Sequence, residues 1–175
     1  MIDNRFFNNP ICKLGTFEVS NGRATAMQDK ASDIDFSIAK YEPEYLRMLM
    51  GSEVYEEYKS TIDDIKWEPL KTRLVDDVNF ISPIANYVYY KHRRITAVSS
   101  DGVKDYTTKT DNTDGVGISS RLVTAWNDMV DLTQPICQYI YNSIITSNTP
   151  AIETVAQWDY SGWEILLKKQ SRLFT

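Results

Sequence analysis

The fold is decided by two stretches, SPIANYVYYKHRRITAV (residues 82–98) and SSRLVTAWNDMVDLTQPICQYIYNSIITS (residues 119–147). Each predicts a long helix, because apolar side chains recur at three- and four-residue steps. In the first stretch Ser82 is a candidate N-cap and Pro83 stands where a first-turn proline is tolerated. The apolar stripe of the second runs through Leu122, Trp126, Met129, Thr133, Ile136, Cys137, Ile140 and Ile144. These stretches predict a mainly α fold, a small helical bundle.

A polar segment separates the two helices. Its sequence, SSDGVKDYTTKTDNTDG (99–115), contains the turn signals Asp101-Gly102 and Asp114-Gly115. It is rich in Thr, Asp and Lys, so we expect it to be exposed. The segment therefore predicts either a short β-hairpin or a loop inserted between the two helices.

The rest of the chain fits one domain of 175 residues with an arm at each end. We expect an N-terminal arm at 1–30, a helical core at 31–148 and a C-terminal extension at 149–175. The core should begin with a helix starting near Ser32-Asp33. Pro43 is expected to interrupt that helix and to open a new one, PEYLRMLM, which ends at Gly51.

Composition limits the class of protein. Hydrophobic residues make up 42% of the chain and aromatic residues 12%, which is enough for a packed core. The net charge of -5 argues against a protein whose main task is to grip nucleic-acid phosphates. No segment has the apolar length of a membrane span or the pattern of a signal peptide, so we expect a soluble protein without membrane contact. Cys12 and Cys137 do not suggest a disulfide framework, although a bond between them is left open.

The sequence offers little chemistry. His92 is the one histidine, and neither cysteine is near it in sequence, so no metal site is predicted. The adjacent pairs Asp63-Asp64 and Asp76-Asp77 diverge on a helix or strand and make no two-carboxylate site. We expect no enzymatic activity, no catalytic residue and no cofactor. The basic run Lys91–Arg94 is either a solvated helix face with salt-bridge partners or a contact for phosphates or carboxylates.

Interface residues are the candidate functional residues. The C-terminal sequence AIETVAQWDYSGWEILLKKQSRLFT carries a heavy apolar load, so it either folds back on the helices or docks on a partner. Trp126 is expected in the core. We predict that the following residues of the extension pack on an adjoining subunit or partner: Trp158, Tyr160, Trp163, Leu166 and Phe174. A second candidate contact is the inserted segment, with Asp101, Gly102 and Tyr106.

The order of elements resembles a family of tailed-phage neck proteins over about residues 32–148. The residues that carry the resemblance fall in three groups: Tyr45, Leu46, Leu49 and Gly51; Tyr87, Tyr89 and Tyr90; Trp126 and Asn127. In these groups the chain looks like the small helical head-tail connector (adaptor) proteins of phages and prophages of Bacteroidetes-type bacteria. It departs from the pattern at Met50, where a leucine is expected, and in its C-terminal segment.

The resemblance implies a structural virion protein that assembles in the host cytoplasm and ends at the head-tail junction. Such connectors form a ring, commonly of twelve copies, beneath the portal protein, and they contact the next neck or tail protein. The ring extends the DNA channel, and DNA passes without specific binding. Two alternatives stay open: another virion part, such as a tail-completion or baseplate protein, and a small cytoplasmic protein-binding regulatory module.

Overall fold

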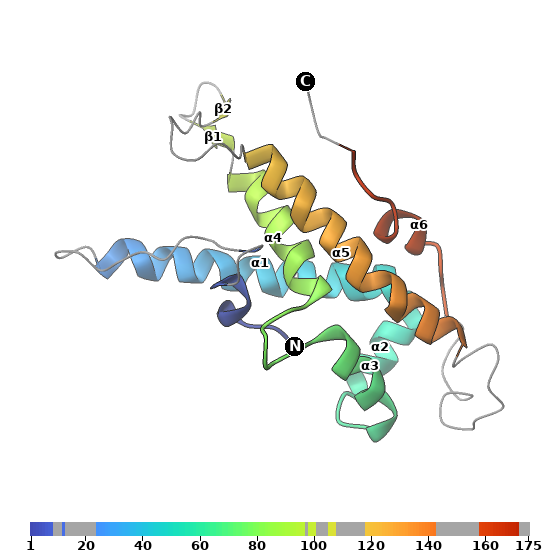
Figure 1. The fold of residues 1–175 in the computed structure, drawn as a ribbon. Coiled ribbons are helices and arrows are strands. Elements are labelled where there is room, and N and C mark those ends of the chain that lie inside the picture. Colours follow the sequence, from blue (N-terminus) through green and yellow to red (C-terminus); the bar gives the residue numbers. More distant parts are fainter. Residues whose placement is uncertain are drawn as a thin grey trace.

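Two antiparallel helices lie side by side across a third, longer helix (Figure 1). This is a computed structural model, and it describes residues 1–8, 12, 24–96, 98–100, 105–107, 118–142 and 158–171. The crossing helices are α4 (Pro83–Thr96) and α5 (Ile118–Tyr141), and the helix behind them is α1 (Ala24–Met50). The predicted mainly α class, a small helical bundle, is confirmed.

Shorter elements complete the described part. Helices α2 (Ser52–Ser60) and α3 (Glu68–Leu74) follow α1, and α6 (Trp163–Leu166) lies near the C-terminus. Two 3-10 turns, η1 (Asn4–Asn8) and η2 (Ile65–Trp67), precede α1 and α3. Between α4 and α5, strand β1 (Val98–Ser100) pairs antiparallel with β2 (Asp105–Thr107), with Ser99 opposite Tyr106.

Helix α4 begins as its sequence predicts. The Ser82 hydroxyl accepts a hydrogen bond from the Ile84 amide at 3.1 Å, and the Ser82 carbonyl accepts the Asn86 amide at 3.2 Å. Pro83 occupies the first turn, where its missing N–H costs no helical bond. The cap is buried, so the polar groups at this helix end are satisfied inside the protein.

The predicted break at Pro43 is wrong. Helix α1 runs without interruption from Ala24 to Met50, so it also begins earlier than the expected start near Ser32-Asp33. A proline inside a helix costs about 3 kcal/mol or more. The apolar face on both sides of Pro43 is buried, and burial of each large side chain returns about 1.5–3 kcal/mol. The buried residues of this face are Ile34, Tyr41, Tyr45, Leu46, Leu49 and Met50.

Gly51 ends α1 as predicted. Its φ of 82° lies in the left-handed region that favours glycine, and its amide donates to the Arg47 carbonyl at 2.9 Å. The chain then turns directly into α2. At this turn the backbone of Gly51 lies next to Asp159, a residue near the other end of the chain.

An aromatic seam joins the three long helices. The Tyr45 ring of α1 lies 5.7 Å from the Tyr87 ring of α4, and the Trp126 ring of α5 lies 6.2 Å from Tyr87 and 4.7 Å from Tyr90. Such ring pairs stabilise a fold by about 0.5–1.5 kcal/mol each beyond the area that they bury. The seam therefore fixes how α1, α4 and α5 sit against one another.

The described part of the N-terminus packs on this body. Phe6 and Phe7 of η1 are buried, and the terminal amino group lies 2.8 Å from Glu42 Oε1. Cys12 is buried with its Sγ 2.8 Å from Asn86 Oδ1. Cys12 and Cys137 are both free thiols, so the disulfide that the sequence left open is not formed.

A buried hydroxyl pair ties α1 to α5. Tyr45 Oη lies 2.7 Å from Thr133 Oγ1, and Thr133 donates its own proton to the Met129 carbonyl at 2.7 Å. Tyr45 is therefore the donor between the two hydroxyls. Burial raises the pKa of Tyr45 far above its usual value, so the proton stays on the ring oxygen.

We predict unequal costs when this pair is broken from either side. T133V leaves the buried Tyr45 hydroxyl without an acceptor and should lower the free energy of unfolding by about 1–3 kcal/mol. Y45F removes that donor and leaves the Thr133 bond to Met129 intact, so it should cost about 0.5–1.5 kcal/mol. Urea unfolding measures both. T124V is the matched control, because Thr124 makes the same bond to Ser120 on an exposed face of α5. Equal losses for T133V and T124V would refute the assignment.

Candidate functional site

The C-terminal strap, defined here as residues 158–171, lies beside α5, and its helix α6 contacts both α1 and α5 (Figure 1). It contains four of the predicted interface residues. Leu166 is 0% exposed, Trp158 is 9% exposed, and Tyr160 and Trp163 are partly buried against the core. In the single chain the strap thus folds back on the helices, which is one of the two arrangements that the sequence left open. Their role at an interface stays a prediction.

The other predicted contacts are only partly visible. Phe174, Asp101 and Gly102 lie outside the described residues. Tyr106 is described by its backbone, in β2 opposite Ser99. Trp126 is buried, as expected for a core residue.

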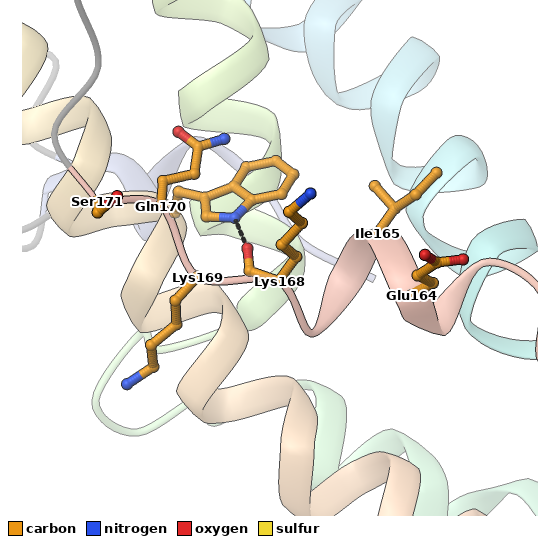
Figure 2. Close-up of a pocket in the computed structure, with 7 residues that line it drawn as sticks. Glu164, Ile165, Lys168, Lys169, Gln170 and Ser171 are labelled. Carbon is orange, nitrogen blue, oxygen red and sulfur yellow. Dashed lines mark hydrogen bonds between the residues drawn. The ribbon is translucent and has the colours of Figure 1, made fainter.

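Trp126 and Asn127 hold the strap by its main chain. The Trp126 indole donates from Nε1 to the Lys168 carbonyl at 2.7 Å, the dashed bond in Figure 2. The Asn127 amide binds Gln170 twice: Nδ2 donates to the Gln170 carbonyl at 3.0 Å, and the Gln170 amide donates to Oδ1 at 2.8 Å. A side-chain amide that pairs with both polar groups of one residue imitates the pairing of a neighbouring β-strand.

A second anchor holds the other end of the strap. The Trp163 indole donates from Nε1 to the Leu49 carbonyl at 2.6 Å, at the last turn of α1. Gly162 lies so close to α1 that a Cβ there would stand 2.2 Å from the Met48 carbonyl oxygen. A Cβ on Gly51 would likewise meet Asp159 Cβ at 2.6 Å. Two glycines thus allow the strap to approach the end of α1 within main-chain contact distance.

The strap borders an open cleft of about 540 Å³. Figure 2 shows its labelled lining residues, which come from the strap itself, while Trp126 belongs to α5. The lining residues are Trp126, Glu164, Ile165, Lys168, Lys169, Gln170 and Ser171. The cleft combines an indole, an isoleucine that is 55% exposed and charges of both signs.

Charge at the strap is partly balanced. Lys169 Nζ lies 2.7 Å from Asp131 Oδ1 on α5, and both side chains are more than half exposed, so the pair contributes little to stability. Burial and the neighbouring Asp131 raise the pKa of Asp128, while Lys169 opposes the rise. The main-chain hydrogen bonds and the buried side chains of the strap, rather than the ion pair, therefore hold the strap in place.

The basic run on α4 is engaged inside the chain. Lys91 Nζ lies 2.9 Å from Glu44 Oε1, and the guanidinium groups of Arg93 and Arg94 lie over the rings of Tyr89 and Tyr90. His92 Nδ1 lies 2.9 Å from Ser37 Oγ. The helix-face interpretation, with partners from the same chain, accounts for these contacts.

The described ranges hold no metal-binding cluster of three or more His, Cys, Asp or Glu side chains. No helix among them combines the length and apolar character that crossing a membrane requires. Comparisons of the chain with protein-family models, with curated proteins and with solved structures give no match.

Sequence reasoning named the Trp-Asn pair without its role. Asn127 stands beside the apolar stripe of α5 and is partly buried, which is a position where an amide needs a partner. That signal points to a bonded amide, but the partner, Gln170, lies 43 positions away and has no motif of its own. Lys168–Gln170 were therefore missed as a bound segment.

We predict that N127L releases the strap. Leucine neither donates to the Gln170 carbonyl nor accepts the Gln170 amide, so hydrogen exchange at that amide should speed up by about tenfold or more, the equivalent of 1.4 kcal/mol. Q134L is the matched control, because it makes a similar change at an exposed position of the same helix. Unchanged exchange at Gln170 in N127L would refute the attachment by Asn127.

We also predict a loss of stability in mildly acidic solution that depends on His92. Burial lowers the pKa of His92, with Arg93 acting in the same direction and Asp33 opposing. Below about pH 6.5 the unfolded chain takes up a proton that the folded chain binds less well, so stability falls as pH drops through this range and is fully present above it. Urea unfolding at pH 7.5 and 5.5 should show this loss, and H92N should reduce it. An equal loss in H92N would contradict the assignment.

Proposed function

We propose that this protein is a structural component of a tailed-phage neck, a head-tail connector whose copies form a ring below the portal protein. In this proposal it joins head to tail, extends the DNA channel and presents a surface to the next neck or tail protein. As such a component it would act without a catalytic residue, a cofactor or membrane contact. Its place is the virion, after assembly in the host cytoplasm.

One observation supports the proposal most strongly. The residues that carry the resemblance hold segments of the chain together. Tyr45, Tyr87, Tyr90 and Trp126 form the aromatic seam between the three long helices. Gly51 ends α1 where the strap arrives, and Asn127 binds the strap. A pattern whose members serve rigid packing fits a structural scaffold.

Electrostatics is consistent with a channel that DNA passes. The net charge of -5 disfavours retention of phosphates, because cationic walls would bind them. Within the basic run, Lys91 is paired with Glu44, and Arg93 and Arg94 stack on tyrosines. These contacts compete with any binding of phosphates by the same side chains.

The mass of the purified protein in solution tests the proposal. Light scattering should find either ring-sized oligomers or a smaller species that binds the portal protein at fixed stoichiometry. A repeated head-to-tail contact closes a ring of defined copy number, so the mass should reach a plateau as concentration rises. A stable monomer or dimer indifferent to the portal would overturn the proposal and favour another virion position or the regulatory module.

A further inference from the structure

We propose that Trp126 and Asn127 form a binding site for an extended main chain, and that in the assembled protein its occupant is the strap of a neighbouring copy. This inference rests on the ring assembly proposed above. It names the contact that links one copy to the next: residues 168–170 of one chain on α5 of another.

The site recognises main chain, not side chains. All three hydrogen bonds from Trp126 and Asn127 involve the backbone of Lys168 or Gln170. At the second anchor the strap contributes a side chain, because the Trp163 indole donates to the Leu49 carbonyl of α1. A neighbouring copy offers the same groups in the same order, so exchange loses none of these bonds. This is the condition under which swapping an identical element between copies costs little.

The strap depends on its seat. Its helix α6 has four residues, Trp163–Leu166, and a helix of that length is not stable alone. Leu166 is fully buried and Trp126 nearly so, and separation would expose both to water. The site on α5 and the strap therefore each need the other to cover their buried side chains, whether both come from one copy or from two.

The chain is long enough for exchange. Residues 143–157 connect the end of the described part of α5 to the strap, and a segment of this length reaches at most about 50 Å when extended. A compact domain of this size has a radius of gyration of about 16 Å. The connection can thus cross from one copy to an adjacent one.

Crosslinking two co-expressed full-length variants tests the exchange. One carries D131C and the other K169C, at positions whose native side chains lie 2.7 Å apart and are more than half exposed. A short bismaleimide joins the introduced thiols, and the native cysteines are both buried, with burial raising the pKa of Cys137 to about 12. The double variant D131C/K169C shows that the two positions are within reach.

Exchange predicts a covalent dimer of the two single variants on a denaturing gel and a ladder of multimers from the double variant. N127L in both chains should reduce the dimer by about tenfold, the equivalent of 1.4 kcal/mol, and Q134L should not. A crosslink confined to one chain of the double variant overturns the inference. The absence of any crosslink also overturns it, because the strap then does not lie on Asp131 in either arrangement.

Light scattering of the same samples separates this inference from the proposed function. Rings without mixed crosslinks overturn the exchange and leave the connector proposal standing. Mixed crosslinks in a species that never exceeds a dimer support the exchange and overturn the ring.

Discussion

The Trp126 indole is the contact on which the rest of the structure depends. Its ring packs on Tyr87 and Tyr90 of α4, and its N–H binds the carbonyl of Lys168. One side chain of α5 therefore orders the neighbouring helix and the C-terminal strap together. Because a buried indole N–H needs an acceptor, the core at this point is satisfied only when a strap is present.

The two ends of the strap are held in different ways. At Trp126 and Asn127 the attachment is by hydrogen bonds to the main chain of the strap, whereas at the other end the Trp163 side chain binds the Leu49 carbonyl and Gly51 and Gly162 allow a close approach of the backbone. In both places the residues in contact stand far apart in the sequence. The long helices and the strap therefore pack together as one unit, in which the strap contacts both α1 and α5.

The sequence predicted those features that are encoded locally. Ser82 and Pro83 predict the start of α4, and Gly51 predicts the end of α1. The apolar spacing of α5 predicts its buried face. The break at Pro43 was wrong because tertiary burial of residues such as Tyr45 and Leu49 outweighs a local penalty. The site was missed for a related reason: Asn127 binds backbone atoms, and backbone atoms have no sequence signature.

A site that binds the main chain of a segment constrains the spacing of the bound residues more than their identity. Trp126 and Asn127 place few demands on the side chains of Lys168 and Gln170, but they require that Gly162 and Trp163 reach α1 while residue 170 reaches Asn127. Related tails can therefore differ at positions 168 and 170 and still bind, provided that Gly162, Trp163, the buried Leu166 and the number of residues between the two anchors are kept. Such tails are expected to share few residues and to align only where the spacing between these anchors is matched.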